Sequence, residues 1–474
     1  MDHITDVPIG VMAPQRFESV LDEAAYERFS SLFEHARKLF EGRVIWNVNS
    51  TASGGGVAEM LRSLLTYARG AGVDARWVVI DGNQDFFRVT KRIHNNLHGA
   101  TGDGGFLGEP ERAMYEGALA GNAEELIPLI RPEDIVILHD PQTAGLTEGL
   151  KATGATIIWR CHVGLDTPND LARRAWSFLR PYIRTADAYV FSRKAFAWED
   201  LDDSKIYIIA PSIDAFSPKN QEMETTTVAS ILDATHLVED GSHEHPVFIR
   251  EDGSPGRVDR ATQMFDGGPP APSSVPIVTQ VSRWDRLKDP IGVIEGFVRR
   301  VAPHSDAHLI VAGPAVAAVS DDPEGADVLR EAFEAWQGLP DDMKSRVHLA
   351  CLPMDDGQEN AAIVNALQRR ADVIVQKSLA EGFGLTVAEG MWKARPLVAS
   401  RIGGIQDQIV DGVTGLLVDD PEDLDEYGDA VLKLLQDKAA AQRMGEEAQR
   451  RVREEFLGPR SLIQYAGLIE KLIT

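Results

Sequence analysis

Residues 376–389 read QKSLAEGFGLTVAE, and this stretch decides how the rest of the chain is interpreted. An apolar run ends at Gln376, small residues follow at Gly382 and Gly384, and the composition from Leu385 onward is that of a helix. This order predicts a strand, a loop and a helix N-terminus. The free N–H groups and the positive dipole end at such a junction suit an oxygen-rich, anionic ligand.

Glu381 lies in the predicted loop and Glu389 in the predicted helix. A glycosidase interpretation needs two carboxylates about 5 to 10 Å apart. Eight helical residues rise roughly 12 Å, so the two groups lie at different depths of one wall and not across a scissile bond. Carboxylates accept two hydrogen bonds from vicinal diols. We therefore interpret both residues as binders of hexose or ribose hydroxyls, with ordinary surface carboxylates as the alternative.

Length and composition predict a soluble globular protein of two domains. The chain has 474 residues, 43% hydrophobic and 26% charged. It contains no apolar run of membrane-spanning length, and MDHITDVPIG lacks the features of a signal peptide. We therefore expect a cytoplasmic protein without a membrane partner. Cys161 and Cys351 predict neither a disulfide nor a zinc site, and we expect no metal centre.

The formal net charge of −25 argues against a nucleic-acid partner, because binding a phosphate backbone requires clustered Lys and Arg. The charge does not exclude a phosphorylated small molecule. A few cations near a ligand outweigh a remote, screened acidic surface.

Apolar runs followed by helical patterns or Gly turns recur in both halves of the chain, which predicts two doubly wound parallel sheets. The predicted strands are 43–48, 75–80, 134–139, 156–162, 188–192 and 206–210 in the first half and 276–282, 308–312, 346–352, 372–376, 397–400 and 415–418 in the second. The predicted domains are 1–211, a Gly- and Pro-rich interdomain segment 212–274, and 275–458, with the helix 459–474 packing back on the first domain.

The glycine run 54–56 precedes a predicted helix and, with Asp81 downstream, partly matches a dinucleotide-binding fingerprint. The match fails where the third glycine is required, because the chain has Glu59 there. We prefer a Gly-rich loop, including Gly55 and Gly56, that approaches a diphosphate or a sugar. A tight turn without a ligand is the alternative.

Polar residues follow two strands of the first half, in HDPQTAGL (139–146) and HVGLD (162–166). The carboxyl ends of parallel strands are where open α/β sheets bind ligands. We expect His162 to donate to a sugar hydroxyl and Asp140 to accept from another, with polar groups that are satisfied within the fold as the alternative. Cys161 is no partner for His162 in nucleophilic catalysis, because neighbours on a strand point to opposite faces.

Arg283 and Lys288 stand on a predicted strand-to-helix loop, the same kind of position as Glu381. Arg offers a bidentate fork and Lys a point charge, which together suit two adjacent phosphates. Combined with Glu381 and Glu389, they would grip a nucleotide diphosphate sugar at its phosphates, ribose and hexose.

These motifs resemble those of retaining glycosyltransferases of family 4, whose GT-B architecture has two Rossmann-like domains facing across a cleft. The resemblance extends over residues 43–454. Within this family, the motifs are most similar to those of the trehalose glycosyltransferring synthases and the retaining trehalose phosphorylases. The segments that carry it are NVNSTASGGGVAEML (47–61), ILHDPQTAGL (137–146), WRCHVGLD (159–166), QVSRWDRLKDPIGVI (280–294) and QKSLAEGFGLTVAEGMW (376–392).

The resemblance implies a nucleotide diphosphate glucose as donor and co-substrate, glucose as acceptor and α,α-trehalose as product, in a reversible reaction. It implies no tightly bound cofactor and leaves stimulation by Mg²⁺ and a homodimer open. The site residues that it implies are Arg283 and Lys288 on the leaving diphosphate, Glu389 on ribose, Glu381 and His162 on the donor glucose, Gly384 and Leu385 as backbone donors, Gly55 and Gly56 on phosphates, and Asp140 and Gln142 on the acceptor.

The implied mechanism is front-face displacement with retention, in which the leaving diphosphate takes the acceptor's proton and no enzymic base is needed. Residues 238–274 look more like those of the phosphorylases. The natural leaving group can therefore be either a nucleotide diphosphate or inorganic phosphate. Two further hypotheses compete with a transferase, namely a sugar-nucleotide sensor without turnover and a nicotinamide-dependent oxidoreductase.

Overall fold

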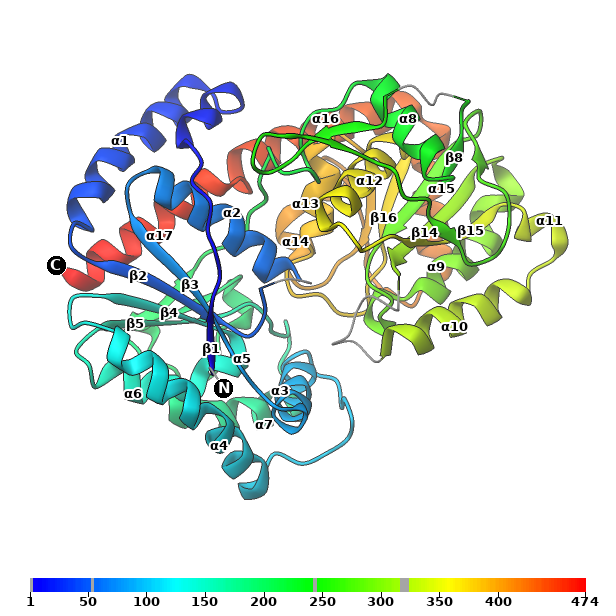
Figure 1. Cartoon of the computed structure of the whole chain (residues 1–474). Helices are drawn as coiled ribbons and strands as arrows, with labels where there is room; N and C mark the ends of the chain where they lie inside the picture. The colour runs from blue at the N-terminus through cyan, green and yellow to red at the C-terminus, as the bar shows by residue number, and fades with distance from the viewer. Residues whose placement is uncertain (1–2, 53–54, 242–244, 316–323) are drawn as a thin grey trace. The chain divides into compact units, whose positions relative to one another are not determined.

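The computed structural model describes residues 3–52, 55–241, 245–315 and 324–474. The chain divides into two compact units, an N-terminal unit (Met1–Ser212 with Phe456–Thr474) and a C-terminal unit (Ile213–Glu455). Each unit is built on a seven-stranded sheet with helices around it (Figure 1).

The sheet of the N-terminal unit has the order β1-β3-β2-β4-β5-β6-β7, and all its strand pairs are parallel except β1 with β3. The strands are β1 (Ile4–Asp6), β2 (Val44–Asn49), β3 (Asp74–Ile80), β4 (Ile135–His139), β5 (Thr156–Cys161), β6 (Ala188–Phe191) and β7 (Ile206–Ile208). The helices are α1 (Glu23–Leu39), α2 (Gly56–Gly70), α3 (Gln84–Leu97), α4 (Glu109–Leu126), α5 (Asp140–Thr143), α6 (Thr147–Lys151), α7 (Asp170–Ile183) and α17 (Gly458–Ile473).

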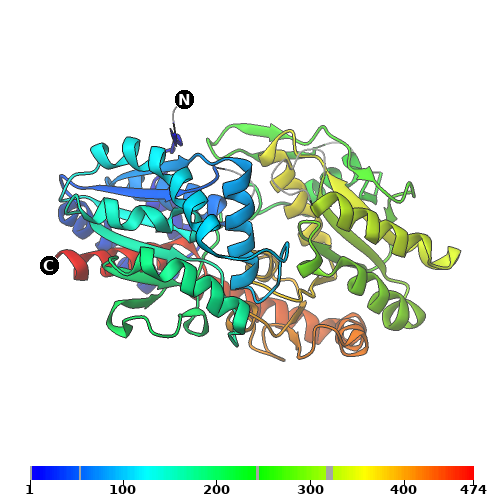
Figure 2. The ribbon, with the colours of Figure 1, turned by 90° about the horizontal axis from the view of Figure 1, so that it is seen from below.

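Helices cover both faces of this sheet. In Figure 1, α1, α2 and α17 lie above the strands and α4, α6 and α7 below them, and Figure 2 views the unit from the side of α4 and α7. Strand β2 is buried at all six positions. Burial on both faces explains why the strand begins with three apolar residues in succession, VIW (44–46), and its two asparagines, Asn47 and Asn49, are buried as well.

The sheet of the C-terminal unit has the order β11-β15-β14-β13-β16-β17-β18, and only β11 pairs antiparallel. The strands are β11 (Gln263–Met264), β13 (Ile277–Val281), β14 (His308–Pro314), β15 (Val347–Leu352), β16 (Val373–Gln376), β17 (Leu397–Ser400) and β18 (Leu416–Val418). The helices are α8 (Thr225–Ala234), α9 (Pro290–Gly296), α10 (Glu324–Gln337), α11 (Asp341–Lys344), α12 (Gly357–Arg370), α13 (Leu385–Trp392), α14 (Ile405–Gln408), α15 (Leu424–Gln436) and α16 (Lys438–Glu455).

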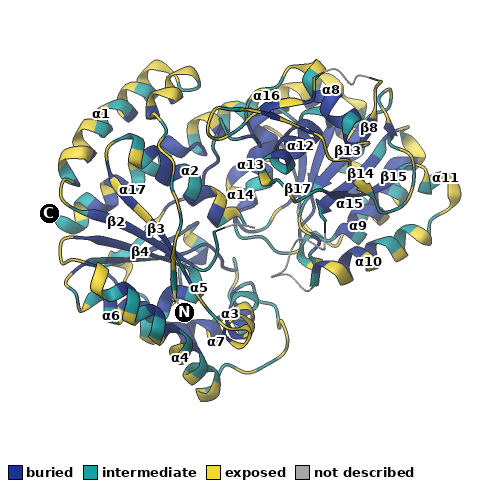
Figure 3. Cartoon of the chain, in the orientation of Figure 1, coloured by how far each residue is buried: buried dark blue, intermediate teal, exposed yellow. Residues whose placement is uncertain are grey.

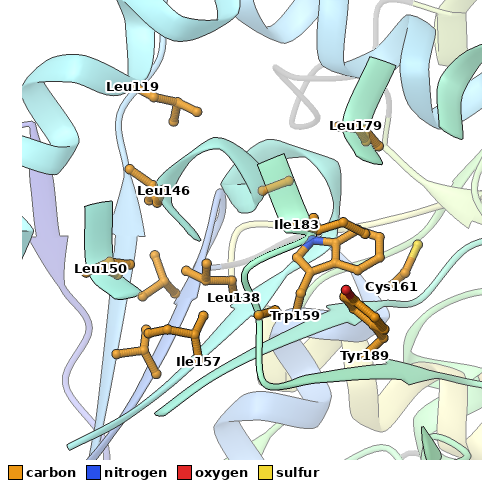
Figure 4. Packing of buried hydrophobic residues seen from close by; sticks show 14 of the residues in the cluster. Leu119, Leu138, Leu146, Leu150, Ile157, Trp159, Cys161, Leu179, Ile183 and Tyr189 are labelled. Atoms are coloured by element: carbon orange, nitrogen blue, oxygen red, sulfur yellow. The ribbon is translucent and has the colours of Figure 1, made fainter. Parts of the chain in front are cut away.

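The strands of both sheets form the cores, whereas helices such as α1, α10 and α16 expose one side (Figure 3). In the N-terminal unit, the rings of Trp159 and Tyr189 pack with aliphatic side chains that include Leu179 and Ile183 of α7 (Figure 4). Cys161 and Cys351 are both buried with free thiols.

Each of the twelve predicted strands coincides with a parallel strand of the structure. The two antiparallel edge strands, β1 and β11, were not predicted. They contain three and two residues, too few to produce a periodic pattern, and they join the sheets through backbone pairing with β3 and β15.

Residues 213–274 are part of the C-terminal unit and do not form the predicted interdomain segment. Ile231, Leu237 and Phe248 of this stretch are buried in one cluster with Ile310 of β14 and Leu367 of α12. Gly253 lies in the turn between the small strands β9 (Val247–Ile249) and β10 (Pro255–Arg257), whereas Pro255 and Gly256 are part of β10 itself. A high content of Gly and Pro indicates many turns, but it does not indicate whether the apolar residues between those turns are buried.

Candidate functional site

The C-terminal sheet changes direction between β13 and β16. From β13 the chain continues outward through β14 and β15 on one side, and from β16 through β17 and β18 on the other. Loops that follow the two central strands meet at such a switch point, where open α/β sheets bind ligands. The loops are joined by a hydrogen bond of 2.8 Å from the Leu379 N–H to the Leu287 carbonyl.

Lys288 and Glu381 come together at this point. The Lys288 Nζ lies 2.5 Å from the Glu381 Oε2, although the residues are 93 apart in sequence. Both side chains are largely buried, with 15% and 12% exposure. The Gln280 side-chain amide donates to the Lys288 carbonyl at 2.9 Å and holds the loop against β13. The structure therefore brings together one cation and one carboxylate of the predicted site.

Arg283 occupies the start of the same loop but does not contact Glu381. Its guanidinium lies 3.4 Å from the Asp285 carboxylate, and its side chain is 45% exposed. Asp285 in turn accepts a hydrogen bond from the Leu287 N–H at 2.8 Å. The guanidinium is thus attached to the loop that carries Lys288 and still accessible to an anion.

A second buried ion pair at the switch point was missed in the sequence. Lys377, which follows β16 and is 1% exposed, pairs with Asp289. Asp289 has a positive φ of 48° and caps α9 through the Gly292 N–H at 3.0 Å. The sequence signal that could have revealed this pair was a lysine directly after a predicted buried strand, because a buried charge is tolerated only when it is paired.

Glu389 lies inside α13, 5% exposed, and has a different set of neighbours from Glu381. Its carboxylate is 3.7 Å from the Lys219 Nζ. Lys393 donates to the Glu389 carbonyl at 3.1 Å and to the Asn220 side chain at 3.0 Å. Burial lowers the pKa of Lys393 to about 7, against the opposing effect of Glu389. The two glutamates of the motif therefore lie among different residues of the unit.

Gly384 is the N-cap of α13, and its φ of +80° favours glycine. Leu385 is the first residue of the helix, where backbone N–H groups have no partner within the helix. Both residues are placed as a backbone anion site requires.

The loop that contains Glu381 is held from behind by residues 403–408. The Gly404 N–H donates to the Gly382 carbonyl at 2.8 Å, and the Gln408 amide donates to the Phe383 carbonyl at 2.5 Å. Gly403 has a φ of +48°, and a Cβ at this position would lie 1.9 Å from the Glu381 carbonyl oxygen. This segment also lacked a recognisable signal in the sequence.

In the N-terminal sheet the change of direction falls between β2 and β4. Gly55 and Gly56, after β2, form the N-cap and first residue of α2, and a Cβ on Gly55 would meet no atom within 4 Å. Gly54 lies outside the described residues. Asp140 and Gln142, after β4, lie on the short helix α5, where Gln142 is half-buried.

Asp140 and His162 are joined directly. The Asp140 Oδ1 accepts from the His162 backbone N–H at 2.7 Å, and Asp140 has a positive φ of 64°. Within the described residues its Oδ2 has no hydrogen-bond donor. Burial raises the pKa of Asp140 to about 7, against the opposing effects of that hydrogen bond and of Arg160.

The ring of His162 takes part in a buried chain of polar groups. Its Nε2 lies 3.1 Å from the His139 Nδ1, and the His139 Nε2 lies 3.1 Å from the Asn47 Oδ1. The Arg160 Nε–H donates to the His162 Nδ1 at 3.5 Å. One tautomer satisfies all three contacts, with a proton on each Nε2.

Both histidines are neutral at physiological pH. Burial lowers the pKa of His139 to about 3, and burial followed by the Arg160 charge lowers the pKa of His162 well below its usual value. In this tautomer the Nε2 proton of His162 is already donated to His139. With Nδ1 accepting from Arg160, both ring nitrogens of His162 have partners within the fold, so Nε2 is not available as the donor that the sequence suggested.

Comparison with known proteins places the chain in a family. A family model described as trehalose synthase, N-terminal domain, matches residues 47–198, and one described as glycosyl transferases group 1 matches residues 265–451. A trehalose synthase of Pyrococcus horikoshii is 34% identical over 100% of this chain and 99% of its own length. The chain belongs to the trehalose synthase family. The resemblance inferred from the motifs is confirmed, and the chain is a trehalose-related glycosyltransferase that transfers a hexose.

Other relatives agree with this family. The trehalose synthase of Rubrobacter xylanophilus is 36% identical, with 94% of each chain covered. A trehalose phosphorylase of Pleurotus pulmonarius is more distant, at 24% identity over 90% of this chain and 57% of that protein.

Solved structures confirm the predicted GT-B fold. An α,α-trehalose-phosphate synthase from Burkholderia xenovorans superposes with a TM-score of 0.65 at 16% identity, covering 91% of this chain and 100% of the other. A sucrose-phosphate synthase from Thermosynechococcus elongatus gives 0.61 at 17% identity, covering 91% and 99%. None of the helices in the described part of the chain is long and apolar enough for a membrane crossing.

Proposed function

We propose that this member of the trehalose synthase family is a retaining glucosyltransferase that forms α,α-trehalose from a nucleotide diphosphate glucose and glucose, reversibly. The observation that carries the proposal is the Lys288–Glu381 pair at the β13/β16 switch point. The full-length similarity to proteins named trehalose synthase supports the choice of product.

In this proposal Lys288 and Arg283 bind the diphosphate of the donor, and the backbone N–H groups at Gly384 and Leu385 add partial positive charge. Lys288 already neutralises Glu381, so the arriving diphosphate shares its ammonium group. Glu381 is then free to accept from the hydroxyls of the donor glucose. Glu389 accepts from the ribose hydroxyls, held in place by Lys219.

The residues of the N-terminal unit bind the sugars and phosphates that the motifs suggested. The Asp140 Oδ2 accepts from a hydroxyl of the acceptor glucose, with Gln142 beside it on α5. His162 contacts the transferred glucose, and Gly55 and Gly56 approach a phosphate. The reaction requires no tightly bound cofactor in this proposal, and Mg²⁺ would act only on the nucleotide diphosphate.

The chemical step breaks the bond between C1 of the donor glucose and the diphosphate oxygen and forms a bond from C1 to the acceptor hydroxyl oxygen. The acceptor's proton passes to the departing diphosphate oxygen. Attack from the face that the diphosphate leaves retains the configuration. The protein lowers the barrier by stabilising the charge that develops on the diphosphate.

The test is to incubate the protein with glucose and a series of nucleotide diphosphate glucoses, and to identify the disaccharide and its anomeric configuration by NMR. A separate incubation with trehalose and inorganic phosphate tests the phosphorylase alternative, which the more distant trehalose phosphorylases favour. α,α-Trehalose in the first incubation supports the proposal. Glucose phosphate in the second alone, or tight nucleotide binding without product, contradicts it.

We expect Arg283→Ala to lower turnover about a hundredfold, because a preorganised charge is lost from the leaving group. Arg286→Ala is the matched control. Arg286 lies on the same loop and is 51% exposed, but it pairs with Glu324 and Glu331 on α10. Equal turnover rates for both variants would contradict the proposed role of Arg283 in binding the diphosphate.

A further inference from the structure

Five cationic side chains lie at the amino ends of the strands of the N-terminal sheet, whereas Asp140 and His162 follow the carboxyl ends. They line a concavity of about 880 Å³ at the amino ends of β2, β3 and β4 and are Arg37, Lys38, Arg43, Arg76 and Arg131. Strand β2 runs from this edge to the other over six residues, or about 20 Å at the usual rise per residue. The concavity is therefore distinct from the site described above.

The cations come from four separate segments. Arg37 and Lys38 lie in the last turn of α1, Arg43 directly before β2, Arg76 within β3 and Arg131 shortly before β4. Basic residues in the last turn of a helix are common, because they complement its dipole. That explanation applies to Arg37 and Lys38 but does not account for the other three.

Two of the arginines are partly neutralised. Arg76 forms two hydrogen bonds with the Asp74 carboxylate, at 3.2 and 3.0 Å. Arg131 pairs with the buried Asp134 at 2.9 Å and lies 3.5 Å from Glu133. These arginines hold the rim of the concavity in place.

The remaining three cations keep their charge available. Within the described residues, Arg37, Lys38 and Arg43 form no ion pair with a carboxylate. Arg43 is half-buried, and within the described residues its guanidinium donates only to the Glu133 backbone carbonyl, at 2.7 Å. A half-buried guanidinium without a counter-ion favours an anion from solution.

The charge of the concavity differs in sign from that of the chain. Its lining residues include two carboxylates, Glu41 and Asp74, against five cations. Adding Glu133 and Asp134, which contact Arg131, still leaves one net positive charge, in a chain with a formal charge of −25. An anion is therefore attracted to the concavity, although the net negative charge of the whole chain would predict repulsion.

The concavity also has an apolar part, formed by Phe40, Trp46 and Leu129. Trp46 is buried, and its ring lies 5.0 Å from the Arg76 guanidinium carbon. The volume lies within the usual range for small-molecule sites and exceeds what inorganic phosphate fills. Guanidinium groups match phosphate oxygens in a bidentate geometry.

We propose that this concavity is a second ligand site, which binds the phosphate group of a small phosphorylated metabolite such as a sugar phosphate or a nucleoside monophosphate. Its phosphate contacts Arg43 and Arg37, and its organic part lies toward Phe40 and Leu129. Because the ligand joins α1 to the amino ends of the central strands, it stabilises the N-terminal unit by mass action.

The experiment measures binding of glucose 6-phosphate, AMP and inorganic phosphate by calorimetry, together with the shift in melting temperature. The full-length protein is compared with Arg43→Gln and Arg37→Gln. We expect an organic phosphate to bind with one equivalent and raise the melting temperature, and each substitution to weaken it about tenfold or more. Arg330→Gln is the control, because Arg330 is an exposed arginine of α10 that pairs with Asp327 and Glu334.

A double variant, Arg283→Ala with Lys288→Ala, separates this site from the proposed donor site. We expect it to retain the organic phosphate bound at the concavity while it loses transferase activity. No binding to the unaltered protein, or unchanged binding in Arg43→Gln and Arg37→Gln, would overturn the second site. Loss of binding only in the double variant would also overturn it, by assigning the phosphate to the donor site.

Discussion

Asp140 combines two features that are individually unfavourable in a folded protein. Its backbone lies in the left-handed region, with φ 64°, and burial raises the pKa of its carboxyl to about 7. Side chains with a Cβ adopt this backbone conformation at a cost, although Asn and Asp tolerate it best. Strain and an altered pKa at one residue are typical of a functional position.

The raised pKa predicts how stability depends on pH. The folded protein holds the Asp140 proton up to about pH 7, whereas an unfolded Asp loses it near pH 3.9. Between these values the folded state binds more protons, so this residue lowers the free energy of unfolding as the pH rises, and the loss is complete above pH 7.

We therefore expect Asp140→Asn to be more stable than the unaltered protein at pH 8 and to lose most of this advantage at pH 4.5. Asn can accept the same hydrogen bond from the His162 N–H and also suits a positive φ. Thermal unfolding at both pH values measures the difference. The fully exposed Asp170 provides the control, since Asp170→Asn should show no such pH-dependent gain. A transferase rate that survives Asp140→Asn would contradict the proposed acceptor role.

At the scale of elements, two helix–strand junctions and one supporting loop build the candidate donor site. The loop after β13 supplies Lys288, the loop after β16 supplies Glu381, and the segment before α14 holds the second loop in place. Because Gly403 contacts the Glu381 backbone so closely, the position of Glu381 depends on a residue with no side chain.

Gly403→Ala tests this dependence. Its Cβ would collide with the Glu381 carbonyl at 1.9 Å and would also be strained at φ +48°. Gly412→Ala is the matched control, because Gly412 has φ +75° but no atom within 4 Å of the added Cβ. We expect Gly412→Ala to lower the free energy of unfolding by about 1–2 kcal/mol, the usual strain of this conformation, without affecting turnover. Gly403→Ala should lose more stability and at least tenfold in turnover, and equal effects of the two substitutions would contradict the supporting role.

At the scale of the whole molecule, residues 456–474 belong to the N-terminal unit although they follow the C-terminal unit in sequence. Helix α17 belongs to the N-terminal unit, where it contacts α1 and α2. Its inner side is apolar, and Leu468 and Ile469 are buried to 4% and 2% exposure. The N-terminal unit is therefore complete only after the last helix is in place.

We expect Ile469→Ala to lower the free energy of unfolding of the N-terminal unit by about 2–5 kcal/mol, the usual effect of truncating a buried aliphatic side chain. Ile463→Ala, on the same helix at 37% exposure, should change it by less than about 1 kcal/mol. Denaturant unfolding followed by hydrogen exchange assigns the loss to one unit. A loss confined to the C-terminal unit would contradict the assignment of α17.

The parallel strands of both units could be predicted because strands buried on both faces have continuous apolar sequences. The same holds for the motif at 376–389, since a strand, a glycine turn and a helix start are local events. The antiparallel edges β1 and β11 escaped prediction because backbone pairing, and not their side chains, places them in the sheets.

The sequence by itself thus determined two doubly wound sheets and the kinds of residue that follow their strands. Only the tertiary structure decided which of those residues meet. It paired Lys288 with Glu381, buried Lys377 against Asp289, engaged both ring nitrogens of His162 and placed residues 213–274 in the C-terminal unit. It also gathered cations from four segments at one edge of a sheet. These are contacts between residues distant in the chain, and they depend on sheet order, which local sequence patterns do not specify.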